Sequence, residues 1–483
     1  MRRKLLESFN ETYILNLHGN SRIGEKCPDG SPDENVFDIM QGVSIALFVK
    51  SRKQKGLGKV FYQDVYSLRE KKYEYLNKHD IKSTKWIRLQ PSEPYYFFVK
   101  KDFSLQARYD KFWSIQDIFI KSSSGVKTHR DHFVVGFTKE EIMQRMRTFT
   151  SDLPDDLVRQ GLNLKDTHDF KLKEVRERLR KEDWKDSILP YSYRPFDNRY
   201  ICYRPELIDR DRFEVMHHFY QDNIGICVTR QLSTPDFLHA FVTNNVADIC
   251  SVSIKTRETG YIFPLYLYTK RDNPTKKHSL KTFMLLFEPQ ADYFVRKPNL
   301  SEVLIDKLTK TLKKSLTPEQ IFFYIYSILY SNIYRTKYAE FLKIDFPRVP
   351  FTKDYKLFSK MAELGEKLVD LHLMKSSELD PPVAKLQGKG DNKVEKLKYD
   401  DKERHLYVNQ NQYFKGITKE VWQYQIGGYR VCDKWLKDRK GRRLSLDDIK
   451  HYCKIITSLQ KTIKIQKVID NIYPEVEKET VEF

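Results

Sequence analysis

The hydrophobic pattern of the first hundred residues predicts β-strands rather than helices. A short apolar run at 13–17 (YILNL) is followed by a second at 43–49 (VSIALFV), which lacks the alternation of a half-buried strand. A continuous apolar run of this length is typical of a strand buried on both faces. Gly56-Leu-Gly58 then precedes a third run at 60–66 (VFYQDVY), and the glycines predict a hairpin turn between the second and third strands.

The rest of the chain alternates between helical and strand-like patterns. Residues 152–186 are polar with helical spacing, and residues 188–270 return to short strands rich in Tyr, Phe, Ile and Val. Thr317-Pro-Glu-Gln320 is a strong helix start and predicts a helix that runs through Tyr338. We expect a second helix over 353–374.

The C-terminal hundred residues begin with a stretch that is rich in helix breakers. Residues 381–403 carry Pro, Gly and many charges, which predicts an internal linker or an exposed loop. Ser445-Leu-Asp-Asp448 then predicts the start of a last long helix. Its apolar residues recur three and four positions apart, from Ile449 to Ile463, as on one face of a helix.

Composition places the chain among globular proteins of the cytosol. Hydrophobic residues make up 40% of the chain and aromatic residues 13%, which is enough for real cores. The longest near-apolar stretch, 321–333, contains serines and an asparagine and falls short of the roughly 20 residues that span a bilayer. Six cysteines without a CxxC pair fit a reducing compartment. We therefore expect a cytoplasmic protein with no membrane partner.

Charge is the first positive indication of function. The 86 Lys and Arg residues exceed the 66 Asp and Glu residues, which gives a formal net charge of +20. Such an excess favours a polyanionic partner, and for a cytosolic chain nucleic acid is the leading candidate. The alternative is that these charges only keep the surface soluble, as in a non-catalytic interaction protein.

Three segments combine cations with the residue types that contact DNA. The loop 124–131 (SGVKTHRD) holds glycine, hydroxyls and cations, which suit phosphate binding, although a solvated hairpin explains it equally well. The segment 193–200 (YRPFDNRY) sets two arginines among aromatic residues, where they either read guanine or form a structural corner with Asp197. Residues 434–443 hold six cations and one acid. The residues that we expect at DNA are Lys127, Thr128, Arg130, Arg194, Arg199, Arg230, Lys255, Arg257, Lys437 and Arg439.

Candidate catalytic motifs are weaker. Asp155, with Asp169 and Lys171, satisfies the loose carboxylate–lysine pattern of metal-dependent nucleases, so a stand-alone DNA nuclease remains an alternative function. The cysteines and histidines lack the spacing of structural zinc ligands, and we expect no metal site. Asp380-Pro-Pro-Val383 is similar to the tetrapeptide of amino-methyltransferases but lacks the aromatic residue that stacks on a flipped base.

Several longer motifs, in order along the chain, resemble the Type ISP restriction–modification enzymes. These are single polypeptides with nuclease, helicase, adenine-specific methyltransferase and target-recognition parts, and the resemblance is to their C-terminal part. The motifs that carry it are 14–20 (ILNLHGN), 33–39 (DENVFDI), 42–45 (GVSI), 125–131 (GVKTHRD), 193–197 (YRPFD), 334–335 (YR), 345–350 (DFPRVP), 388–392 (GKGDN), 425–429 (QIGGY) and 435–439 (WLKDR).

The resemblance implies a mixed α/β chain in three parts. Residues 1–110 resemble the trailing half of the methyltransferase domain, with a partial sheet. Residues 111–385 resemble the main α+β target-recognition domain. Residues 386–483 resemble a β-plus-helix module that closes the specificity region, with long C-terminal helices. The implied function is recognition of a specific sequence in double-stranded DNA for adenine methylation.

The chain also departs from the family's pattern. Neither the F-x-G-x-G loop for S-adenosylmethionine nor the Asn-Pro-Pro-aromatic tetrapeptide occurs in the 483 residues. We therefore expect no catalytic or cofactor-binding residue in this chain. We also expect it to be a truncated or split C-terminal piece, with the methyltransferase, helicase and nuclease parts on an upstream polypeptide. The implied cofactor of the complete enzyme is S-adenosylmethionine.

Overall fold

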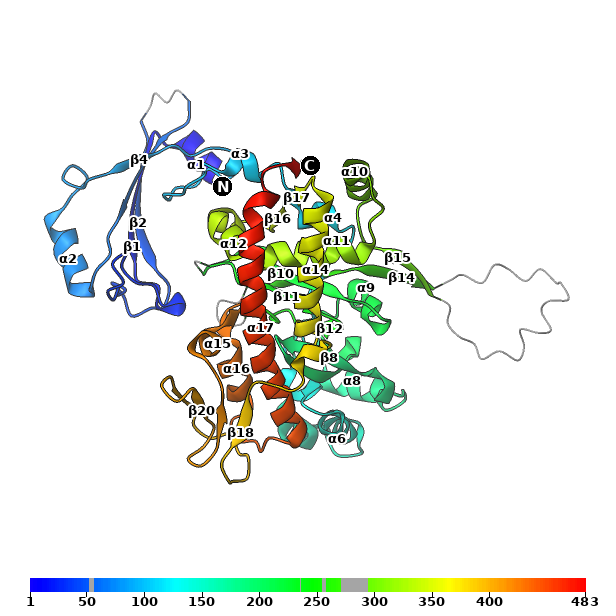
Figure 1. Cartoon of the computed structure of the whole chain (residues 1–483). Coiled ribbons are helices and arrows are strands. Elements are labelled where there is room, and N and C mark those ends of the chain that lie inside the picture. The colour runs from blue at the N-terminus through cyan, green and yellow to red at the C-terminus, as the bar shows by residue number, and fades with distance from the viewer. Residues whose placement is uncertain (52–55, 235, 254–257, 271–293) are drawn as a thin grey trace. The chain divides into compact units, whose positions relative to one another are not determined.

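The chain forms two compact units, residues 1–106 and 107–483. The computed structural model describes residues 1–51, 56–234, 236–253, 258–270 and 294–483 (Figure 1). Both units mix helices with small sheets, so the predicted mixed α/β class is confirmed. The division into three functional parts stays a prediction.

The first unit is built around one four-stranded sheet of order β2-β1-β3-β4. Strand β1 pairs in parallel with β3 and antiparallel with β2, and β3 pairs antiparallel with β4. The predicted hairpin between the second and third apolar runs is therefore wrong, because β1 lies between them. The elements are α1 (Arg2–Ser8), β1 (Glu11–His18), β2 (Val43–Val49), β3 (Lys59–Asp64), α2 (Arg69–Lys78) and β4 (Ile87–Leu89).

Strand β2 is exposed rather than buried, which corrects the expectation from its continuous apolar pattern. Ile45 and Leu47 are each 41% exposed, and Phe48, on the opposite face, is 40% exposed. Central strand β1, by contrast, buries Leu15 and Leu17. Strand β2 is an edge strand that pairs only with β1 among the described residues. Among the described residues the ring of Phe9 lies 5.1 Å from that of Phe48, but both faces of β2 stay largely open.

In its described residues, the second unit contains three four-stranded sheets and several two-stranded ones. The larger sheets have the orders β11-β10-β13-β6, β12-β8-β9-β7 and β18-β21-β20-β19. Their strands are β6 (Ser123–Ser124), β7 (Val135–Gly136), β8 (Ile188–Arg194), β9 (Asp197–Cys202), β10 (Gly225–Thr229), β11 (Ala240–Thr243), β12 (Val246–Ala247), β13 (Gly260–Pro264), β18 (Lys385–Gln387), β19 (Lys398–Asp400), β20 (His405–Tyr407) and β21 (Tyr413–Lys415). Between the first two sheets and the helices α6 (Lys139–Thr150), α7 (Asp155–Gly161) and α8 (Leu172–Leu179) lies one large apolar core.

Long helices hold the C-terminal half of this unit together. Helices α14 (Tyr355–His372) and α17 (Leu446–Val476) pack against each other and against α11 (Pro318–Tyr330), as Figure 1 shows. The predicted starts are confirmed, because Thr317 and Ser445 each form a capping box with the residue three positions on. The predicted helix from 317 to 338 is interrupted, however. Ser331 ends α11 and its hydroxyl caps α12 (Asn332–Lys337).

The breaker-rich stretch 381–403 is part of a sheet rather than a linker, which corrects the sequence prediction. It supplies β18 and β19, the two edge strands of one sheet, and Gly388 directly follows β18. Gly388 has φ +91°, and a Cβ there would lie 1.9 Å from the carbonyl oxygen of Asn411. The glycine therefore serves a tight turn against a neighbouring chain segment. No helix in the described residues is both long and apolar enough to cross a membrane.

Candidate nucleic-acid interface

The loop that follows β6 is fixed to the segment around residue 210 by backbone hydrogen bonds. The Lys127 amide donates to the Arg210 carbonyl at 3.0 Å, and the Arg210 amide donates back to Lys127 at 3.1 Å. A Cβ on Gly125 would lie 2.5 Å from the carbonyl oxygen of Asp248, so glycine allows this close approach. The Arg212 side chain also donates to the Ser124 hydroxyl at 2.9 Å. The two segments therefore form one ordered surface.

Two of the predicted phosphate contacts in this loop are buried. The Thr128 hydroxyl bonds to the Asp131 carboxylate, and Arg130 is only 4% exposed. The Arg130 guanidinium bonds to Asp209 and to the Leu207 carbonyl, and it lies 4.4 Å from the centre of the Phe170 ring. These contacts give both residues a structural role in shaping the loop. A DNA contact by either residue stays a prediction.

Lys127 and His129 remain accessible in the same loop. Lys127 is half-buried and forms no ion pair with a carboxylate in the part of the chain that the structure describes. The His129 side chain is 53% exposed and bonds to Asp209. His129 also adopts φ +57°, a left-handed conformation that is costly for a residue with a Cβ. The loop therefore presents Lys127 and His129 outward while Arg130 points inward.

Arg194 forms a buried corner with Asp248. Its Nη1 lies 2.9 Å from Asp248 Oδ1, and the Tyr191 hydroxyl donates to Asp248 Oδ2 at 2.7 Å. Arg194 is 5% exposed, and its guanidinium lies 3.7 Å from the centre of the Tyr193 ring. Arg194 thus forms a structural corner, but with Asp248 and not with the Asp197 of the sequence prediction. Base reading by Arg194 stays a prediction.

Asp197 is held by two arginines from distant parts of the chain. Arg199 Nη2 donates to Asp197 Oδ2 at 2.7 Å, and Arg439 Nη2 donates to Asp197 Oδ1 at 2.9 Å. The Asp197 side chain is 2% exposed. Burial opposes ionisation of this carboxyl, but the charges of Arg439 and Arg199 hold its pKa below the usual value. Arg199 and Arg439 therefore join the β8–β9 hairpin to helix α16 (Val431–Lys437).

The remaining predicted contacts differ in their accessibility. Arg230 is 51% exposed and lies 2.8 Å from Asp345, and Lys437 is 63% exposed and lies 2.7 Å from Asp433. Both cations can therefore reach solvent, and a DNA contact by either stays a prediction. Lys255 and Arg257 lie outside the described residues.

The two carboxylates of the alternative nuclease site each have a basic partner of their own. Asp155 is paired with Arg176, which is 1% exposed and also bonds to the Phe149 carbonyl. Asp169 is 62% exposed and bonds to its neighbour His168. In the described ranges, no group of three His, Cys, Asp or Glu side chains is placed to hold a metal ion. This geometry gives the nuclease interpretation no support.

One edge of the first unit's sheet gathers polar side chains that bond to one another, and binding of S-adenosylmethionine by this unit stays untested. At the carboxyl ends of β1 and β3, His18 bonds to Glu25 at 2.8 Å and to Asp64 at 2.7 Å. Burial opposes protonation, but these two carboxylates raise the pKa of His18. Asn35 packs against Gly19, where a Cβ would lie 2.4 Å from the Asn35 Cα. The polar groups at this edge are therefore engaged with one another.

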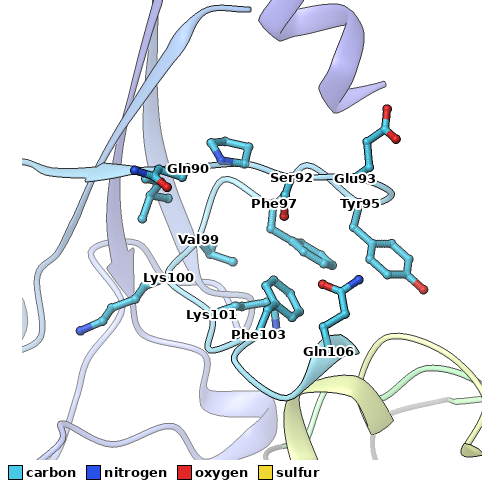
Figure 2. A pocket seen from close by; sticks show the side chains of 12 residues that line it. Gln90, Ser92, Glu93, Tyr95, Phe97, Val99, Lys100, Lys101, Phe103 and Gln106 are labelled. Atoms are coloured by element: carbon cyan, nitrogen blue, oxygen red, sulfur yellow. The ribbon is translucent and has the colours of Figure 1, made fainter. Parts of the chain in front are cut away.

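A separate hollow in the same unit is small. It measures about 90 Å³ and is lined by residues between Leu89 and Gln106. Figure 2 shows the rings of Tyr95, Phe97 and Phe103 around it. Pockets that hold cofactor-sized molecules usually measure roughly 300–1,000 Å³. This hollow is too small for such a ligand.

Sequence reasoning missed the exposed residues next to the 124–131 loop. Arg210 is exposed, and Phe213, His217 and Tyr220 follow it on helix α9 (Phe213–Met216) and the turn after it. Phe213 is 50% exposed and Tyr220 is 46% exposed. The sequence did offer a signal for these residues, because Arg210-Asp-Arg212 is followed directly by three aromatic rings at positions 213, 217 and 220.

The fold is similar to that of solved restriction–modification enzymes. The structure of the ATP-dependent Type ISP restriction-modification enzyme LlaBIII bound to DNA aligns with 97% of this chain and with 32% of the LlaBIII chain, at 22% sequence identity and a TM-score of 0.74. The structure of a nuclease-deletion mutant of the Type ISP restriction-modification enzyme LlaGI, in complex with a DNA substrate mimic, aligns with 97% of this chain and with 37% of the LlaGI chain. The sequence identity is 19% and the TM-score is 0.69. The structure of the DrdV–DNA complex aligns with 99% of this chain and with 49% of the DrdV chain, at 20% sequence identity and a TM-score of 0.72.

The chain thus spans about a third to a half of the length of these solved proteins. No curated protein sequence matches it significantly. The model of the Type ISP C-terminal specificity domain matches residues 117–468, which is most of the chain and most of the second unit. The chain therefore belongs to the family that carries the Type ISP C-terminal specificity domain.

Proposed function

We propose that this chain recognises a specific sequence in double-stranded DNA, within a Type ISP-like restriction–modification system. The observation that carries the proposal is the specificity domain over residues 117–468. The solved structures of LlaBIII and DrdV are complexes with DNA, which supports DNA as the partner. The net charge of +20 supplies the attraction that a polyanion requires.

The accessible and the buried cations would play different parts in this recognition. Lys127, Arg230 and Lys437 have side chains that can neutralise phosphates. Arg130, Arg194 and Arg439 are each 5% exposed or less and would keep the surface in shape. Phosphate contacts set the position of a protein on DNA, whereas base contacts specify the sequence. We therefore assign orientation on DNA to the accessible cations of the second unit.

Methylation would be completed by another part of the enzyme. In our proposal the target adenine leaves the stack and is methylated on its exocyclic amine. S-adenosylmethionine and the residues that grip the flipped base would be supplied elsewhere, because this chain contains neither sequence motif. Its own role would be to select the site.

The test is selection of bound duplexes from a random-sequence library, followed by filter binding of the selected sequence at several salt concentrations. We expect one sequence to be enriched and the affinity to fall steeply with salt, because bound cations release condensed counterions. Lys127→Ala should lower the log–log salt slope by about 1 without changing the preferred sequence. Arg130→Ala should instead lower the melting temperature, because it removes buried contacts.

Two results would contradict this proposal. Binding without any enriched sequence would mean that the chain does not specify a site. An affinity independent of salt, or no binding at all, would favour an interaction protein whose charge only maintains solubility.

A further inference from the structure

One short helical segment exposes aromatic rings instead of burying them. Phe213 and Tyr220 are exposed and His217 is half-buried, on α9 and on the 3₁₀ turn (His217–Tyr220) that follows it. The rings of Phe213 and His217 stack at 5.1 Å between centroids, with 23° between their planes. Tyr220 meets Phe213 edge-on at 6.3 Å. We call Phe213, His217 and Tyr220 the aromatic face.

The aromatic face is held rigidly from behind. Val215 and Met216 are fully buried on the inner side of the segment, and Phe219 is 7% exposed there. The His217 Nδ1 donates to the Phe213 carbonyl at 2.6 Å, which fixes the imidazole against the helix. The rings therefore keep their positions without a ligand, which lowers the entropy that binding must overcome.

The residue before Phe213 has a strained backbone. Arg212, directly before it, has φ +58° and so adopts the left-handed conformation that residues with a Cβ avoid. Its guanidinium is anchored on the Ser124 hydroxyl of the facing loop, in which His129 has φ +57°. Strained backbone of this kind is concentrated at functional sites.

Two cations belong to the segment that leads into the aromatic face and to the loop bridged to it. Lys127 and Arg210 come from the two bridged segments, and neither forms an ion pair with a carboxylate within the described part of the chain. Three carboxylates lie close by in sequence. Asp209 is engaged by Arg130 and His129, and Asp211 accepts from the Phe213 amide at 3.3 Å. Glu214 is exposed and lies about 100° around the helix axis from Phe213.

We propose that Phe213 and His217 form a stacking surface for a DNA base that has left the duplex stack, with Lys127 and Arg210 on its phosphates. This inference rests on the proposed DNA-binding function and adds a ligand-binding site to it. Aromatic side chains beside cations are the combination that binds unpaired nucleotides, because every base has a π-face. A protein partner fits less well, because the flanking cations would have to be covered together with the rings.

The test compares two duplexes of one sequence, the second of which carries a single extrahelical 2-aminopurine. We expect the wild-type chain to bind the bulged duplex about 10-fold more tightly, as one aromatic–base stack allows. Its 2-aminopurine fluorescence should also be quenched. Phe213→Leu keeps an apolar side chain of similar size but no ring, and it should lose both the preference and the quenching. Phe213→Trp should retain both, and Leu157→Ala, at a 55% exposed leucine elsewhere, should behave as the wild type.

The outcomes separate this inference from the proposed function. If Phe213→Leu keeps the bulge preference, or if the wild type has none, the stacking surface is wrong while paired-duplex binding still stands. If the wild type binds neither duplex, the proposed function fails and the stacking site with it. If the wild type self-associates and Phe213→Leu makes it monomeric, the aromatic face is a protein contact instead. Equal melting temperatures for the wild type and both Phe213 variants would confirm that folding is unchanged.

Discussion

At the scale of single residues, the arginines of this chain fall into two classes that sequence alone could not separate. The segment 193–200 predicted either base readers or a structural corner, and the structure places Arg194 and Arg199 in ion pairs. The deciding partners are remote in sequence. Asp248 lies 54 residues from Arg194, and Arg439 lies 242 residues from Asp197. A local sequence pattern identifies a charged residue, but it does not identify the distant residue that forms an ion pair with it.

Arg194→Ala should strongly destabilise the second unit. The substitution leaves Asp248 buried without its guanidinium, and loss of one partner of a buried ion pair costs about 3–5 kcal/mol. Arg230→Ala is the matched control, because its ion pair with Asp345 is about half exposed and should change stability by less than about 1 kcal/mol. Urea unfolding of both variants measures the difference. Equal midpoints would mean that Arg194 is free to act elsewhere, for example on a base.

Asp197 should make the protein sensitive to acid. Its pKa in the folded chain lies below the ordinary value of 3.8, so the ionised carboxylate stabilises the fold above that pH. This stability is lost as the pH falls through the folded pKa. Asp197→Asn should therefore be less stable than the wild type near neutral pH but should lose less stability on acidification. Melting temperatures from about pH 6 to about pH 3 measure this difference.

Asp248 provides the opposite control in the same pH series. Burial raises the pKa of its carboxyl although Arg194 opposes the shift, and nearby Asp131 adds to it. The Asp248 carboxyl therefore binds a proton more readily in the folded chain than in the unfolded chain. Protonation of Asp248 stabilises the fold, and this contribution is lost as the pH rises. Asp248→Asn should steepen the loss of stability on acidification. The same pH slope for both variants would contradict the assignment of the two carboxyls.

At the scale of elements, the sequence predicted helix starts better than strand pairings. The capping boxes at Thr317 and Ser445 need only four consecutive residues, so they are readable from the chain itself. The pairing of β3 with β1, and the sheet formed by 381–403, depend on segments that are distant in sequence. The exposed β2 was missed because a hydrophobic pattern predicts that a strand is apolar, not what covers it.

Leu47→Lys should improve solubility without unfolding the first unit. The Leu47 side chain is 41% exposed on an edge strand, and such strands are aggregation sites that a lysine blocks. We expect the unfolding free energy to change by less than about 1 kcal/mol. Light scattering at rising protein concentration should fall. Leu17→Lys, at a position 3% exposed, should unfold the unit instead. Equal damage by both substitutions would mean that β2 is covered in solution.

At the scale of the whole molecule, the two units differ in the evidence that relates them to the Type ISP family. The specificity-domain match covers residues 117–468 and so lies in the second unit, whereas the first unit is matched only through the similarity of fold to longer enzymes. The interpretation of residues 1–110 as part of a methyltransferase domain therefore stays a prediction. Its chemical consequence can be tested on the intact chain.

We expect residues 1–483 alone to transfer no methyl group to DNA. Transfer requires S-adenosylmethionine at a glycine loop and a polar residue with an aromatic neighbour to grip the flipped adenine. The sequence contains neither motif. Asp380 cannot replace the second, because Val383 offers no stacking ring and the Asp380 carboxylate lies 2.6 Å from Lys454 Nζ. Calorimetry should detect no binding of S-adenosylmethionine, and labelled methyl groups should not appear in DNA. A polypeptide that supplies both motifs, added in cis or in trans, should restore both signals. Methyl transfer by the chain alone, abolished by Asp380→Ala, would show that this chain carries the catalytic site itself.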